Sequence, residues 1–130
     1  MNASAHASAS EDDGDREPAD RFCEAWGDLL RSAHDGTLTS GTTRRLVNRT
    51  TVLLNLARTS EPVDPGPASE AGAMLVHAHY TDPATLARAV ELLLDHGADH
   101  GADDGRGPAL AGAFAAGWAM ALRERTLREQ

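Results

Sequence analysis

The sequence predicts an all-α fold, with about five helices in a compact bundle and a long C-terminal helix projecting out of it. Apolar residues recur at helical spacing in every long segment, and none has a convincing strand pattern. Hydrophobic residues make up 41% of the 130 residues, but aromatic residues only 4%. A core filled mainly by Ala, Leu and Val suits closely packed helices better than a β-sandwich.

The first helix is predicted to follow a short polar segment. Residues 1–16 are small, polar and acidic, and we expect them to form a disordered tail. Pro18 suits the first turn of a helix that runs to about His34. Cys23, the single cysteine, is interpreted as a small buried hydrophobic residue. The i, i+4, i+7, i+8 spacing of one buried face is carried by Phe22, Trp26, Leu29 and Leu30.

The second helix is predicted from a cap at Thr39 or Ser40 to about Thr59. Its apolar face consists of Leu46, Val47, Thr50, Leu53, Leu54 and Ala57. Arg44, Arg45 and Arg49 lie on the same helix, which has no acid before Glu61. Positive charge near a helix N-terminus is unfavourable because the helix dipole is positive there. These arginines are therefore interpreted either as a binding patch for an anion or a partner, or as an ordinary solvated face.

The third helix is predicted over 67–80, after the proline-rich loop "SEPVDPGP". Its inward face would hold Ala71, Met74, Leu75, Ala78 and His79. Thr81 or Asp82 then caps a fourth helix, which opens at Pro83 and runs to about Asp95. The inward face of this fourth helix would hold Leu86, Val90, Leu93 and Leu94.

The fifth helix is predicted from Pro108 to the end of the sequence, after the four-glycine segment 95–107. A heptad-like line, interpreted as a signalling or dimerisation face, holds Leu110, Ala113, Gly117, Met120 and Leu127. A second apolar stripe holds Phe114, Trp118 and Leu122. Beyond Leu122 charges dominate, and "ALRERTLREQ" contains no helix stop signal. We therefore expect a helical domain over 17–122 and an outgoing helix starting at 123–130.

Charge and targeting signals narrow the function classes. The net charge is −8, of which residues 1–20 carry −5 and the remaining residues −3. An acidic chain disfavours nucleic-acid binding. No signal peptide and no apolar run of about 20 residues is present, so we expect a cytoplasmic protein without membrane contact.

No motif of an enzyme stands out in this segment. A phosphate-binding Gly-rich loop, a nucleophile elbow, a CxxC pair and an HExxH motif are all missing, so we predict neither catalysis nor a cofactor. The weak metal candidates are His96 and His100, four residues apart in a repeated "HGAD". The glycines between them destabilise the helix that such a site needs, so we interpret the repeat as a solvated acidic loop.

His79 is the histidine predicted to face the core. We interpret it as a hydrogen-bonded core residue, and the alternative is a ligand in a pocket that includes Trp118. His77 lies about 200° away around the same helix and cannot share a ligand with it.

Two blocks of the sequence resemble a known family. "EAGAMLVHAHYTDPATLARAVELL" (70–93) and "ALAGAFAAGWAMALRERTLREQ" (109–130) are similar to the helical N-terminal region of actinobacterial, Streptomyces-type cyclic-di-GMP turnover proteins. In that family a PAS domain, a GGDEF diguanylate cyclase domain and often an EAL phosphodiesterase domain follow. The resemblance implies a cytoplasmic regulatory or sensory module, a homodimer whose last helix feeds those downstream domains. The segment contains no GGDEF or EAL sequence, so no catalytic residue follows from it.

Two alternatives remain open at the level of sequence. One is a ligand- or cofactor-sensing domain of globin-like shape, with His79 or His96 as ligand. The other is a stand-alone adaptor that docks a partner through the arginines of the second helix.

Overall fold

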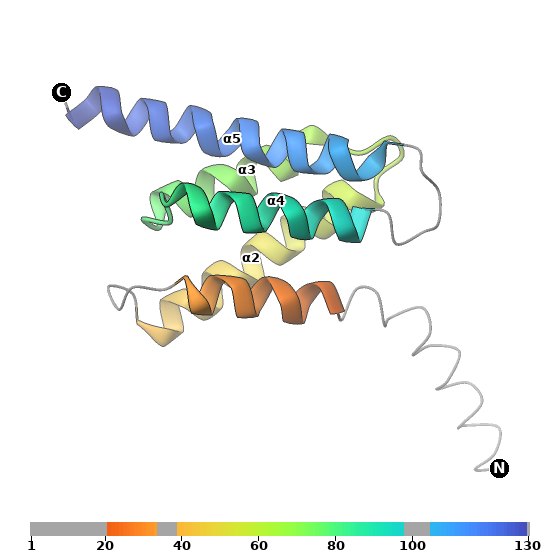
Figure 1. Cartoon of the computed structure of the whole chain (residues 1–130), viewed down its shortest axis with the longest axis horizontal. Helices are drawn as coiled ribbons and strands as arrows, with labels where there is room; N and C mark the ends of the chain where they lie inside the picture. The colour runs from red at the N-terminus through yellow and green to blue at the C-terminus, as the bar shows by residue number, and fades with distance from the viewer. Residues whose placement is uncertain (1–20, 34–38, 98–104, 130) are drawn as a thin grey trace, which may run out of the picture.

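Figure 1 shows a computed structural model of the chain, which describes residues 21–33, 39–97 and 105–129. The predicted all-α fold is confirmed, since every regular element within these ranges is a helix. A first helix covers residues 21–32. It is followed by α2 (Ser40–Thr59), α3 (Pro65–His77), α4 (Pro83–Gly97) and the long C-terminal α5 (Arg106–Glu129).

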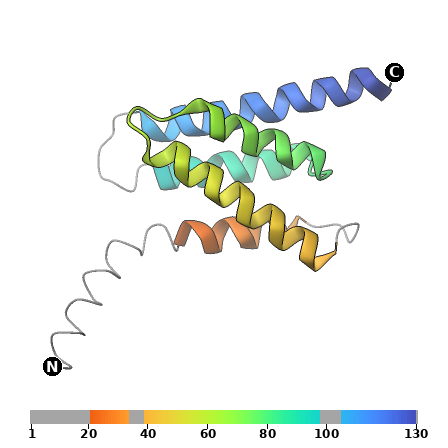
Figure 2. The same ribbon diagram turned by 180° about the vertical axis from the view of Figure 1, so that it is seen from behind.

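The helices are arranged as a three-helix unit with a two-helix layer beside it. In Figure 1, α3, α4 and α5 lie side by side along the long axis, and α4 runs opposite to the other two. The first helix lies at the opposite edge from α5, and α2 crosses obliquely between this helix and the three-helix unit (Figure 2). Consequently α5 forms one outer edge of the described molecule.

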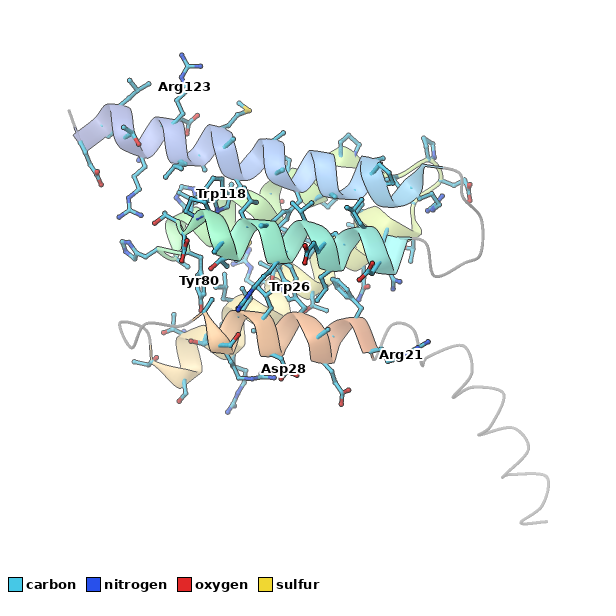
Figure 3. All side chains as sticks on the ribbon, in the orientation of Figure 1. Arg21, Trp26, Asp28, Tyr80, Trp118 and Arg123 are labelled. Carbon is cyan, nitrogen blue, oxygen red and sulfur yellow. The ribbon has the colours of Figure 1, made fainter. Side chains whose placement is uncertain are left out.

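Trp26 joins the two layers at the centre of the core. Its ring stacks on Phe22 with centroids 6.0 Å apart and meets Phe114 of α5 edge-on at 5.6 Å. Its Nε1–H donates to Thr50 Oγ1 of α2 at 2.7 Å, so the polar end of the buried indole is satisfied. Figure 3 shows Trp26 reaching from the first helix toward the other helices.

The ends of α2 are stabilised by different devices. At the start, Thr39 is the cap, as predicted, and its Oγ1 accepts from the Thr42 amide at 3.1 Å. At the other end, the Arg106 guanidinium donates to the carbonyl oxygens of Arg58 and Ser60, the latter at 2.7 Å. A cation at a helix C-terminus is favourable because the helix dipole is negative there. Arg106 thereby fastens the start of α5 to the end of α2.

Several helix boundaries differ from the prediction. α3 begins at Pro65 because the Asp64 side chain caps it, accepting from the Gly66 amide at 3.0 Å. It ends at His77, three residues early, and α5 begins at Arg106 rather than Pro108. Leu94, predicted to face inward, is 39% exposed. The predicted start of α4 at Pro83 is confirmed.

Candidate functional site

The position of α5 depends on two glycines at its crossing with α3. A Cβ added to Gly117 would lie 2.6 Å from the carbonyl carbon of Ser69. A Cβ added to Gly72 would lie 2.9 Å from the amide nitrogen of Trp118. Real Cβ atoms do not approach backbone so closely, so only glycine permits this separation at both positions. We call this crossing the glycine contact.

The five residues of the predicted dimerisation line do not share one free face. Leu110 and Gly117 are buried inside the domain, and Ala113 is half-buried. Met120 and Leu127 are 64% and 59% exposed. The predicted line therefore turns from the interior to the surface along α5, and only its C-terminal half is available to a partner.

The outward side of α5, here the outer face, combines small and apolar residues with a few charged ones. Figure 3 shows Arg123 pointing away from the other helices on this side. The exposed residues that share this side are Ala109, Gly112, Ala116, Ala119, Met120, Arg123, Glu124 and Leu127. Exposed helix faces normally carry mostly polar residues, and here Arg123, Glu124 and the small side chains lie beside two large apolar residues, Met120 and Leu127.

The C-terminal turns of α5 extend past the ends of α3 and α4 (Figure 1). Near this projecting end Arg125 contacts the domain, donating from its Nη1 to the Val76 carbonyl oxygen near the end of α3 at 3.4 Å. Arg125 also pairs with Glu129 at 3.2 Å. A further i, i+4 ion pair joins Arg128 and Glu124 at 3.8 Å. Such pairs support an exposed helix by a few tenths of a kcal/mol each.

His79 does not face the core, and that prediction was wrong. It follows the end of α3 with φ 71°, and its side chain is exposed. The Tyr80 amide donates to the Leu75 carbonyl at 2.8 Å and the His79 amide to the Val76 carbonyl at 3.0 Å. These bonds form a Schellman cap in which His79 takes the left-handed position that glycine usually occupies.

Trp118 is buried, whereas His79 is exposed. Its Nε1–H donates to the Tyr80 carbonyl oxygen at 3.0 Å, and the Tyr80 hydroxyl donates to the Leu30 carbonyl oxygen at 3.1 Å. Figure 3 shows Tyr80 and Trp118 on the same side of the molecule. Of the two residues predicted to line a ligand pocket, Trp118 therefore lies in the core and His79 on the surface.

The predicted arginine patch is exposed but divides into two parts. Arg44 lines a pocket of about 360 Å³ together with Arg31, Ser40 and Thr43. Arg45 and Arg49 lie elsewhere on α2, at i and i+4 of one face. In the described part of the chain, none of these three α2 arginines forms an ion pair.

A feature that the sequence analysis missed continues the line of Arg45 and Arg49. Val52 and Leu56 are 65% and 54% exposed and follow at i+7 and i+11 from Arg45. We call Arg45, Arg49, Val52 and Leu56 the α2 stripe. The sequence could have indicated this stripe, because Val52 and Leu56 are large apolar residues that lie outside the predicted buried face of the helix.

A shallow groove of about 330 Å³ separates the exposed edges of α3 and α5. Its chemistry-bearing residues are Glu70 and His77 of α3 and Met120 and Glu124 of α5. No group of three or more His, Cys, Asp or Glu residues in the described ranges is arranged to hold a metal ion. The side chain of His96, and His100 with most of the HGAD repeat, lie outside what the structure describes.

Comparison with protein-family models, curated proteins and solved structures finds no match. None of the helices in the described ranges is long and apolar enough to cross a bilayer. The features that bear on function are the outer face of α5, the α2 stripe and the resemblance of residues 70–93 and 109–130.

Proposed function

We propose that this domain is a regulatory and dimerisation module of a cyclic-di-GMP signalling protein. In this proposal, two copies pair through α5, and the paired helices set the geometry of the PAS, GGDEF or EAL domains that follow. The proposal is supported by the resemblance of residues 70–93 and 109–130 to the N-terminal region of such proteins. These blocks include most of α3 and α5 and the first eleven residues of α4.

The observation that carries the dimerisation part is the pair Met120 and Leu127 on the C-terminal half of α5. They are seven residues apart and both more than half exposed. A seven-residue repeat places side chains on the seam between two helices that wind around each other. The small residues Ala116 and Ala119 beside Met120 allow a second helix to approach closely.

Sedimentation velocity of the chain tests this pairing. We expect a concentration-dependent dimer that M120E/L127E converts to monomer, because two carboxylates would be buried without partners at the seam. The matched control is V52E/L56E, which adds the same charge at two exposed apolar positions of α2. A chain that stays monomeric up to about millimolar concentration contradicts the proposal, as does a dimer that survives M120E/L127E.

The coding sequence after Gln130 tests the signalling part separately. A reading frame that continues into a PAS, GGDEF or EAL domain is the expected result. In such a protein, M120E/L127E should lower diguanylate cyclase activity, because a cyclase of this class joins two GTP molecules held by two subunits. A stop codon directly after Gln130 overturns this part and leaves the dimerisation result standing.

A further inference from the structure

The α2 stripe combines unpaired positive charge with exposed apolar side chains on one helix face. Arg45, Arg49, Val52 and Leu56 follow the spacing i, i+4, i+7, i+11 and span about 16 Å of α2. In Figure 2, α2 crosses in front of the other described helices. The stripe is on a different helix from the proposed dimer surface, and neither depends on the other.

The charge of the stripe is not balanced within α2. The helix contains no Asp or Glu from Ser40 to Thr59. Arg45 and Arg49 make no ion pair with any carboxylate of the described residues. Arg58, another arginine of the helix, is buried with its guanidinium 5.6 Å from the Phe22 ring centroid and belongs to the fold. Two guanidiniums therefore remain at the N-terminal half of the stripe for an acidic partner.

A shallow depression adjoins the apolar half of the stripe. A pocket of about 290 Å³ is lined by Asn48, Arg49, Val52 and Leu53. It lies where the charged half meets the apolar half, so an inserted apolar side chain would have a guanidinium beside it. Recognition of an amphipathic helix uses this arrangement, in which apolar anchors at helical spacing are flanked by complementary charges.

We propose that the α2 stripe docks an acidic amphipathic helix of a partner protein. Carboxylates in one half of the partner helix meet Arg45 and Arg49, and large apolar side chains in the other half cover Val52 and Leu56. A match of both halves fixes the direction of the partner helix along α2. The stripe then serves as a second interface of the module, separate from α5.

Other anionic occupants match the stripe less well. The acidic residues 2–20 of the same chain contain no Val, Leu, Ile, Met, Phe, Tyr or Trp, so they complement only the arginine half. Nucleic acid and anionic membranes are extended, and they would face a domain whose residues 21–130 carry a net charge of −3. Screening over about 8–10 Å lets a short helix experience mainly the local stripe.

Fluorescence anisotropy of the full chain with designed peptides tests the proposal. The probes are two labelled 18-residue helical peptides, each with glutamates in one half of a face and leucines in the other, in opposite orders. We expect one order to bind with a Kd of about 10–100 μM. R45E/R49E should weaken binding about tenfold or more, and V52T/L56Q about fivefold. The charge control R88E on α4 and the apolar control M120A should change it less than about twofold.

Five outcomes overturn the proposal. The first is that neither peptide binds at about 1 mM. The second is that the stripe variants bind the peptides as tightly as the original chain does. The third is that peptides with lysine in place of glutamate bind equally well. The fourth concerns other occupants: phosphatidylserine vesicles or duplex DNA bind through the stripe while the peptides do not. Neutralising the six acids of residues 11–20 in the full chain tests the internal competitor. If only that variant binds the peptides, the chain's own acidic segment is the occupant and the proposal is wrong.

Circular dichroism and thermal melting check that each variant is folded. All four stripe positions are exposed, so their substitutions should leave the melting temperature nearly unchanged. The proposed dimerisation is measured by sedimentation and depends on Met120 and Leu127. The docking proposal is tested by anisotropy on the α2 variants, and the dimerisation proposal by sedimentation of the α5 variant. Either one can therefore fail without the other.

Discussion

Replacing Gly117 by alanine tests the claim that the glycine contact sets the packing of α5 on α3. The added Cβ would lie 2.6 Å from the Ser69 carbonyl carbon, whereas ordinary contacts begin at 3.4 Å. The helices must therefore separate by at least about 0.8 Å at this point. The obstacle is backbone, which cannot rotate away as a side chain can.

The expected cost follows from two opposing terms. Overpacking against backbone costs about 3 kcal/mol, at the upper end of the usual range. Alanine recovers about 1 kcal/mol of helix propensity. We therefore expect G117A to lower the free energy of unfolding by about 2 kcal/mol, or the melting temperature by roughly 8 °C.

Urea unfolding followed by circular dichroism measures this change, with G112A as the matched control. Gly112 lies on the same helix, is exposed, and a Cβ there would have no neighbour within 4 Å. G112A should stabilise the domain by about 0.5–1 kcal/mol. G72A should resemble G117A, and the double variant should cost less than the sum of the two, because one separation relieves both clashes. If G117A and G112A have the same sign, the glycine contact does not restrict the packing.

Three further predictions concern single contacts, all measured by urea unfolding. H79G should stabilise the domain by about 1 kcal/mol because it removes the strain of a left-handed non-glycine residue; H79A, which keeps a Cβ, should give no gain. R106A should destabilise it by about 2 kcal/mol through the lost carbonyl contacts, while the exposed control R128A stays within about 0.5 kcal/mol; equal effects would contradict the role given to Arg106. T50V should cost about 1–3 kcal/mol because it leaves the buried Trp26 N–H unpaired, whereas T126V at an exposed position should be nearly neutral; a neutral T50V would refute that bond's importance.

The helical periodicity of the sequence was sufficient to predict the fold class and most of the core. Trp26, Leu54 and Leu93 are buried as their spacing predicted, because local periodicity determines which side of a helix is apolar. Thr39 was predictable as a cap because its hydroxyl acts on the amide of a residue close in sequence.

The end of α3 could not be predicted because its signal is atypical. A Schellman cap is normally indicated by glycine, and here His79 occupies that position. The helical pattern of "HAHY" therefore continued past the true end. Tyr80 instead leaves the helix to pack in the core, where it accepts from Trp118.

Part of the predicted dimerisation line is buried in the domain, and one reason is geometric. A seven-residue repeat drifts by about 20° per heptad on a straight α-helix. Over the seventeen residues from Leu110 to Leu127 that drift amounts to about 50°, and α5 also extends past α3 and α4, so Leu110 is buried whereas Leu127 is exposed. The contact of Arg106 with Ser60 was missed for another reason, since it joins residues 46 positions apart and leaves no local pattern.

The glycine contact restricts which mechanical movements the last helix can make. Sliding α5 along α3 by about one helical turn, roughly 6 Å, would bring Ala113 or Ala121 opposite the Ser69 backbone, where only glycine fits. A one-turn piston-like displacement of α5 within the domain is therefore opposed by the close backbone contact. We expect a push or twist applied to the projecting end of α5 to be transmitted to α3 as well. The two helices would then move together as one rigid unit.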